Sequence, residues 1–186
     1  MGNFGGFTPA THRLVTLPDG RRAFAKGATT SLTESWLRDE HKIYTHLSGS
    51  FMPQLIGWDD SGDRPVLLLE DLTDARWPPP WRPGDEEIVL AALEELHAAT
   101  PPPGLPGAGD EFADSWPEVM RDPVPLLGLG LVSDVWLDRN LATFAAASQR
   151  AQIAGDSVAH RDIRSDNSCF TEVRTRCVDW TCASLG

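Results

Sequence analysis

Short apolar runs separated by polar turns fill the first part of the chain. Arg13–Leu17 and Arg21–Lys26 each have the length and pattern of a strand, and Pro18-Asp19-Gly20 between them has the composition of a tight turn. Met52–Trp58 and Pro65–Leu69 are two further runs of this kind, separated by an acidic loop. The pattern predicts four short strands.

Apolar residues at helical spacing mark three longer segments. One helix is predicted over Leu32–Leu47, a second from Asp85 to about Ala99, and a third over Asp134–Ala154, with Gly155 placed to end it. The inward face of the third helix is predicted to comprise Val135, Leu141, Phe144, Ala145 and Ala151. No long element is expected between the second and third helices, because prolines recur there.

The last part of the chain predicts a polar loop between short strands. The strands are expected over Ser157–Ala159, Ser168–Phe170 and Arg176–Val178, with the last two forming a hairpin. This arrangement places Asp162 and Asn167 on one loop and puts Asp179 just past the hairpin.

These polar residues have the spacing of a phosphoryl-transfer site. His160-Arg161-Asp162 followed by Asn167 spells H-R-D-x-x-x-x-N, and Asp179 follows a strand in V-D-W. Asp162 is the candidate catalytic base, and Asn167 and Asp179 are candidate Mg²⁺ ligands, because hard oxygen ligands suit a hard cation. The alternative is an ordinary hairpin, since Asp and Asn also favour turns.

On these motifs, from about Phe7 to Trp180, the chain resembles the aminoglycoside phosphotransferase family. The resemblance implies an α+β, protein-kinase-like fold. Residues 1–75 would form a nucleotide-binding lobe with an antiparallel sheet and one helix, and residues 76–186 an incomplete, mainly helical catalytic lobe. Trp77–Trp81, with three consecutive prolines, would link the two.

The resemblance also implies a phosphate-binding lysine. Lys26 would contact the phosphates of ATP, and Glu40 on the first helix would pair with Lys26 and hold it in place. Glu34 and Asp39 on the same helix are rival partners.

Further site residues follow from the same resemblance. The backbone of Glu70 and Leu72 would hydrogen-bond the adenine, and Arg164 would stabilise charge near the γ-phosphate. His160 is expected to be structural. The glycines of Phe4–Thr8 would let the backbone approach phosphates, although no full G-x-G-x-x-G motif is present. Arg161 stands where many small-molecule kinases have glycine, which leaves the acceptor class open.

Composition excludes some classes of binding partner and some cellular locations. The 186 residues carry a net charge of −11, which argues against binding to nucleic acid. There is no apolar run of membrane-spanning length and no secretory signal pattern at the start. The odd number of cysteines, three, fits reduced thiols and a cytoplasmic location. The family resemblance implies a small-molecule partner with a hydroxyl group, such as an aminoglycoside, another amino sugar, choline or homoserine.

Two alternatives remain at this level. Helices that follow the metal aspartate in the family are missing after Gly186, so the chain is expected to be truncated and would then bind nucleotide at most. A zinc module built from His160, Cys169, Cys177 and Cys182 is a second alternative, although these spacings lack the usual paired-cysteine knuckle.

Overall fold

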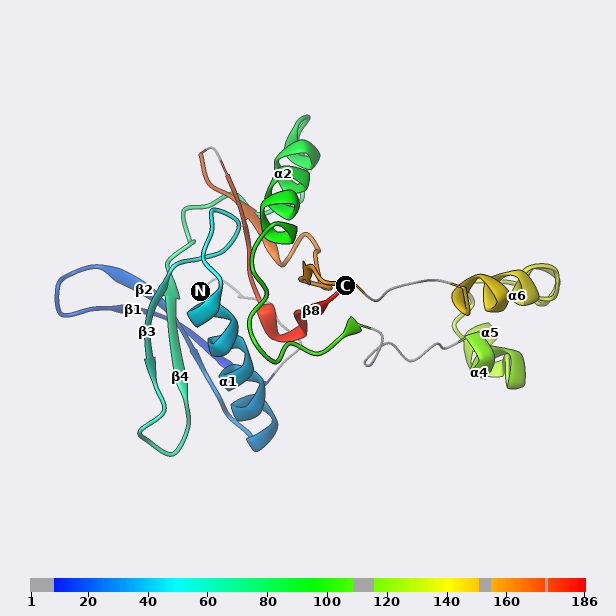
Figure 1. The fold of residues 1–186 in the computed structure, drawn as a ribbon, viewed down its shortest axis with the longest axis horizontal. Helices are drawn as coiled ribbons and strands as arrows, with labels where there is room; N and C mark the ends of the chain where they lie inside the picture. The colour runs from blue at the N-terminus through cyan, green and yellow to red at the C-terminus, as the bar shows by residue number, and fades with distance from the viewer. Residues whose placement is uncertain (1–8, 109–115, 151–154, 173) are drawn as a thin grey trace. The chain divides into compact units, whose positions relative to one another are not determined.

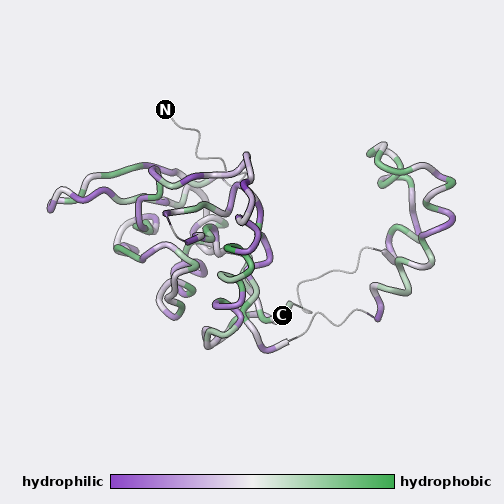
Figure 2. Tube along the Cα trace, turned by 90° about the horizontal axis from the view of Figure 1, so that it is seen from above, coloured by the Kyte–Doolittle hydropathy of each residue, from purple (hydrophilic) through white to green (hydrophobic). Residues whose placement is uncertain are grey.

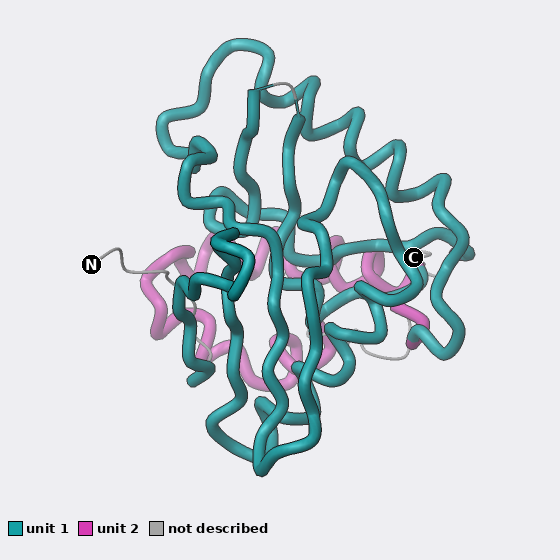
Figure 3. The backbone as a smooth tube through the Cα atoms, turned by 90° about the vertical axis from the view of Figure 1, so that its left-hand side faces the viewer, with its two compact units in different colours: residues 1–105, 156–185 teal, residues 106–155, 186 magenta. Residues whose placement is uncertain are grey.

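The computed structural model describes residues 9–108, 116–150, 155–172 and 174–186, which form a mixed α+β fold. The chain divides into two compact units: residues 1–105 with 156–185 (unit 1), and residues 106–155 with 186 (unit 2; Figure 3). The predicted lobe boundary between residues 75 and 76 falls inside unit 1 and stays a prediction. The glycine segment Phe4–Thr8 lies outside the described residues.

A four-stranded antiparallel sheet opens unit 1, as the strand pattern predicted (Figure 1). Its spatial order is β1 (Thr11–Thr16), β2 (Arg22–Gly27), β4 (Val66–Glu70) and β3 (Leu55–Asp59). Leu67 and Leu69 alternate along β4 and are buried, which is the two-residue period of a strand with one face on a core. The register places Lys26 of β2 opposite Leu67.

Helix α1 (Ser31–His46) follows β2 and packs near β3 and β4. Its first turn is closed by a capping box, in which the Thr30 hydroxyl accepts from the Thr33 N–H. The buried face of α1 includes Leu37, Glu40 and Tyr44, which lie three and four residues apart. A carboxylate therefore stands in the middle of an apolar stripe and needs a partner.

The rest of unit 1 combines a helix with short strands. These elements are α2 (Asp85–His97), β5 (Val158–Ala159), β6 (Ser168–Phe170), β7 (Thr175–Cys177), the 3₁₀ turn η1 (Trp180–Cys182) and β8 (Ser184–Leu185). Strands β6 and β7 form the predicted hairpin, and β5 pairs with β8. Trp180, only 1% exposed, joins one apolar cluster with residues of α1, β4 and α2.

Arg76, in the segment after β4, contacts both α2 and β6. Arg76 forms a two-armed ion pair with Asp85 at the start of α2, and its guanidinium lies 4.4 Å from the centre of the Phe170 ring. The backbones of Arg76 and Phe170 also exchange two hydrogen bonds of 2.8 Å. Residues 77–81 form no helix or strand, as their prolines predicted.

Unit 2 contains α4 (Trp116–Arg121), α5 (Val124–Gly128) and α6 (Asp134–Ser148). Phe144 of α6 stacks on Trp116 and Trp136, with ring centres 4.9 and 5.6 Å away. The two helices before α6 are short, in agreement with the proline-rich sequence.

Two predictions for α6 are wrong. Val135 is 59% exposed, because the buried stripe runs through Leu137, which was not predicted, and the predicted Ala145. The predicted Ala151 lies outside the described residues. The helix ends at Ser148 rather than Ala154, so Gly155 does not cap it. The Ser148 hydroxyl donates to the Ala145 carbonyl oxygen, which satisfies a backbone acceptor in the last turn.

No helix in the described part of the chain is long and apolar enough to cross a membrane. Hydrophobic and hydrophilic stretches are instead interspersed along the helices of each unit (Figure 2).

Candidate active site

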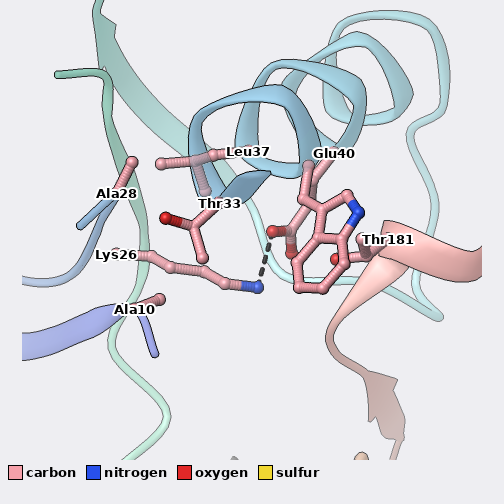
Figure 4. Close-up of a pocket in the computed structure, with 8 residues that line it drawn as sticks. Ala10, Lys26, Ala28, Thr33, Leu37, Glu40 and Thr181 are labelled. Carbon is pink, nitrogen blue, oxygen red and sulfur yellow. Dashed lines mark hydrogen bonds and ion pairs between the residues drawn. The ribbon is translucent and has the colours of Figure 1, made fainter. Parts of the chain in front are cut away.

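Lys26 and Glu40 form a buried ion pair. The Lys26 Nζ lies 2.6 Å from Glu40 Oε2, and the two residues are 9% and 1% exposed. Figure 4 shows Lys26 extending from β2 toward Glu40 on α1, in a small hollow that Thr33, Leu37 and Thr181 also line. The predicted pairing is therefore present. Asp39 instead binds Lys42 on the surface, and Glu34 faces Arg38.

Asp179 is a second partner of the same lysine. Its Oδ1 accepts from Lys26 Nζ at 3.0 Å and from the Thr181 hydroxyl at 2.8 Å. Burial of the ammonium works against its charge, but the two carboxylates outweigh that cost and raise the pKa of Lys26. Burial would also raise the pKa of Asp179, but Lys26 outweighs that effect and lowers it. Lysine and aspartate therefore stay charged.

Glu40 also reaches the segment that carries Asp179. Burial raises the pKa of Glu40, and Lys26 opposes that shift. The Glu40 Oε1 lies 3.4 Å from the Trp180 backbone nitrogen, which donates to it. One carboxylate thus joins β2, α1 and η1.

His160 connects the two polar segments of the site. Its Nε2 is 3.0 Å from the Val178 carbonyl oxygen, and its Nδ1 is 3.3 Å from the Asp162 N–H. A carbonyl only accepts and an N–H only donates, so the ring is neutral with its proton on Nε2. Burial lowers the pKa of His160, in agreement with a neutral ring. The expected structural role fits this geometry.

Two residues of the site have left-handed backbone conformations. Arg161 has φ 66° and Asp179 has φ 63°, and among the described residues other than glycine these are the two with positive φ. Such a conformation is unfavourable for a residue with a Cβ, and it persists where surrounding contacts hold it. Here the hydrogen bonds of His160 lie next to Arg161, and the contact with Lys26 holds Asp179.

Asp162 has neighbours at both carboxylate oxygens. Asn167 Nδ2 donates to Asp162 Oδ2 at 2.7 Å and to the Asp162 backbone oxygen at 3.0 Å. Arg164 Nε lies 3.1 Å from Asp162 Oδ1, and the same guanidinium binds Asp166. The three predicted loop residues are therefore in contact. Asp162 remains one-third exposed, so a ligand can reach its carboxylate.

Two side-chain oxygen atoms of this region are available to bind a hard cation. The hydrogen bonds of the Asn167 side chain to described residues all use Nδ2, which leaves its Oδ1 available. Asp179 binds Lys26 and Thr181 through Oδ1 alone, which leaves Oδ2 available within the described structure. The Val178 N–H, next to Asp179, donates to the Asn167 carbonyl oxygen. This hydrogen bond holds Asn167 and Asp179 on neighbouring segments. A carboxylate and an amide oxygen fit Mg²⁺.

Glu70 and Leu72 lie at the end of β4, apart from these contacts. The Glu70 side chain accepts from the Gln54 N–H and lies 3.5 Å from Arg176. The Leu72 carbonyl oxygen accepts from the Ala75 N–H and the Trp77 indole. Their backbone contacts with adenine stay predictions.

The zinc alternative finds no support. The part of the chain that the structure describes, which includes His160 and all three cysteines, has no group of three or more His, Cys, Asp or Glu placed to hold a metal ion. Burial raises the pKa of Cys169 to about 12 and that of Cys177 to about 11, so both are protonated thiols at neutral pH.

Sequence reasoning missed two contributors to the site. The Thr181 hydroxyl and the Trp180 N–H bind Asp179 and Glu40 respectively. Thr181 stands two positions after Asp179, and this short spacing was the available signal for its contact. No local signal marked the contact between Trp180 and Glu40, which are 140 positions apart.

The site combines a buried lysine–glutamate pair with a loop aspartate, an asparagine and a second aspartate. This combination is typical of phosphotransferases of the kinase-like class. The chain belongs to the phosphotransferase enzyme family, whose model matches residues 5–186. This match confirms the resemblance drawn from the sequence motifs. No curated protein matches the chain.

Proposed function

We propose that this protein is an ATP- and Mg²⁺-dependent kinase of the cytoplasm that phosphorylates a hydroxyl group of a small molecule. The observation that carries the proposal is the 3.0 Å contact between Lys26 and Asp179, which are 153 positions apart. It brings a charged lysine for phosphates next to a carboxylate with a free oxygen for a cation. Neither the hairpin alternative nor the zinc alternative requires such a contact.

Lys26 supplies a fixed positive charge for phosphate oxygens. Glu40 accepts one hydrogen bond from the ammonium and Asp179 accepts another, so the lysine is oriented before ligand arrives. Preorganised charge lowers the cost of reorganisation during phosphoryl transfer. A bound Mg²⁺, held by Asn167 and Asp179, would neutralise phosphate charge.

Asp162 has the position and chemistry of a base for the acceptor hydroxyl. The hydroxyl oxygen bonds to the γ-phosphorus while the bond from that phosphorus to the β,γ-bridging oxygen breaks, leaving ADP. The hydroxyl proton passes to the Asp162 carboxylate. Asn167 fixes one oxygen of this carboxylate, and Arg164 supplies positive charge beside the other.

The acceptor is proposed to be a cationic small molecule such as an aminoglycoside or another amino alcohol. The net charge of −11 favours attraction of a cation over attraction of an anion. An exposed carboxylate as base suits a hydroxyl better than an amine, which is protonated at neutral pH.

A second candidate is a protein that binds nucleotide without phosphoryl transfer. The contact of Arg164 with Asp162 favours it, because this guanidinium occupies the carboxylate oxygen that Asn167 leaves open. Turnover of ATP separates the two candidates.

Calorimetric titration of the full chain with ATP, with and without Mg²⁺, tests the proposal. We expect binding that requires Mg²⁺ and is lost in Asp179→Ala. Asp63→Ala, on an exposed loop, is the matched control and should bind like the unchanged protein. Equal binding by Asp179→Ala, or no binding by the folded protein, overturns the proposed site. ATP consumption with a panel of amino alcohols and aminoglycosides then separates kinase from binding protein.

A further inference from the structure

Arg22 ties the start of β2 to the segment that follows β4. Its Nη2 donates to the Thr73 hydroxyl at 3.1 Å and to Asp74 Oδ2 at 2.9 Å. Its Nε lies 2.7 Å from Asp71 Oδ2. Half of the arginine side chain is exposed, yet it has three partners on one short segment about fifty positions away in the sequence.

Asp71 is the centre of this segment. Its Oδ1 accepts from the Thr73 N–H at 2.9 Å and from the Thr73 hydroxyl at 2.6 Å, which closes a turn. The Asp71 side chain is 8% exposed, and its Oδ2 has no aligned hydrogen bond to the described residues. The Arg22 charge at 2.7 Å therefore offsets a nearly buried carboxylate.

Leu72 lies inside this turn. Its carbonyl oxygen accepts from the Ala75 N–H at 3.1 Å and from the Trp77 indole at 3.3 Å. Its own N–H has no hydrogen-bond partner among the described residues. The shape of the turn therefore sets the direction of a free backbone donor.

The strand register sets the distance from the end of β4, just before the turn, to Lys26. Glu70 stands opposite Ala23, three residues along β2 from Lys26. Three strand residues span about 10 Å. A nucleotide bound by Lys26 at its phosphates can extend along β2 and place its base near the end of β4.

We propose that Arg22 is a positioning residue for the nucleobase: it holds the turn Asp71–Asp74 in the shape that points the Leu72 N–H at an acceptor nitrogen of the base. The proposal rests on the proposed nucleotide-binding function. It assigns Arg22 no contact with the phosphates, which Lys26 binds. Loss of Arg22 therefore weakens recognition of the base and leaves recognition of the phosphates unchanged.

The test compares MgATP with magnesium tripolyphosphate, a probe that has the phosphates and no base. Both are titrated by calorimetry into the full chain and into Arg22→Gln. We expect ATP affinity to fall about tenfold, the order that one net hydrogen bond contributes. Tripolyphosphate affinity should stay the same. Arg22→Lys keeps a charge beside Asp71 and should lose less ATP affinity than Arg22→Gln.

Arg21→Gln is the matched control, because the exposed Arg21 side chain binds the local turn residue Asp19 and no other described residue. It should bind both probes like the unchanged protein. Equal losses for both probes in Arg22→Gln, or no loss for either, overturn the proposal. If Arg22→Gln does not fold, the same comparison of the two probes is made with Arg22→Lys. Absence of ATP binding by the unchanged protein is a different outcome, because it overturns the proposed function itself.

Discussion

Lys26 on β2 and Asp179 after β7 share a hydrogen bond of 3.0 Å across 153 positions of sequence. Glu40 holds the other side of the same ammonium at 2.6 Å and also accepts from the Trp180 N–H. The lysine is therefore a junction between the sheet, α1 and the segment that carries the candidate metal ligand. A substitution of Lys26, Glu40 or Asp179 should therefore alter the hydrogen bonds of the other two residues.

Glu40→Gln should destabilise the fold and weaken nucleotide binding. The substitution removes one charge of a buried pair and leaves Lys26 with Asp179 alone, at a cost of about 3 kcal/mol in the free energy of unfolding. Urea titration measures that loss, and calorimetry with MgATP measures binding.

Asp39→Asn is the control for Glu40, because Asp39 lies on the same helix and pairs with Lys42 at the surface. Its effect should be close to zero. A larger loss in Asp39→Asn than in Glu40→Gln would contradict the assignment of the buried pair.

Stability should fall as the pH drops below about 6.5, in part because of His160. Burial lowers the pKa of this histidine in the folded protein, so the unfolded chain takes up a proton first. The destabilisation from His160 is absent well above pH 6.5. It grows as the pH falls toward the lower pKa of the folded protein and is complete below that pKa. Urea midpoints at several pH values between about 5 and 8 measure the slope.

His160→Gln isolates this contribution, because glutamine offers a donor for the Val178 carbonyl oxygen and does not titrate. Groups other than His160 also contribute to the pH dependence of stability, including Glu40, whose raised pKa works in the opposite direction. The difference between the two proteins is therefore the relevant quantity. An unchanged slope in His160→Gln would contradict the prediction.

Alkylation should separate the three cysteines. Burial raises the pKa of Cys169 to about 12 and that of Cys177 to about 11, so neither forms thiolate at about pH 8. Cys182 is exposed. Peptide mapping by mass spectrometry should find Cys182 modified in the native protein and all three modified in denaturant. Modification of Cys169 before Cys182 would show that the β6–β7 hairpin opens.

Local pattern was enough to predict much of the site. The spacing from Asp162 to Asn167 lies within one loop, and a hairpin between short strands follows directly from the apolar runs. Glu40 was identified through the family resemblance, with Glu34 and Asp39 left as rivals. Its buried position on α1 decides between the three, because a buried carboxylate needs a partner.

The remaining features depend on tertiary contacts. The hydrogen bond between Lys26 and Asp179 joins segments that no local pattern connects. The three contacts of Arg22 with the turn after β4 also join distant segments, about fifty positions apart. The face of α6 was misassigned at Val135 because several apolar stripes fit that helix. Spacing along the helix also does not show that Phe144 stacks on Trp116 of α4.

Arg76→Lys should lower the urea midpoint of unit 1. Arginine forms a two-armed pair with Asp85 and lies over the Phe170 ring, and lysine lacks the planar fork that both contacts need. Arg82→Lys, at an exposed position of the same segment, is the control and should leave the midpoint unchanged. Equal midpoints for the two variants would show that the planar contacts of Arg76 contribute little.

Asp162→Asn should abolish turnover and spare nucleotide binding. The amide has nearly the shape of the carboxylate but cannot take the acceptor proton, so the catalytic rate should fall by about 10²–10⁴. The contacts of Lys26 with Glu40 and Asp179 do not involve Asp162, so the dissociation constant of MgATP should stay within about twofold of its value in the unchanged protein. Asp166→Asn removes the neighbouring exposed carboxylate that binds Arg164 and is the control. ATP consumption is measured with whichever acceptor gives the highest rate. Equal rates in Asp162→Asn and the unchanged protein would remove Asp162 from the role of base, while lost ATP binding would show that the loop serves the nucleotide rather than the acceptor.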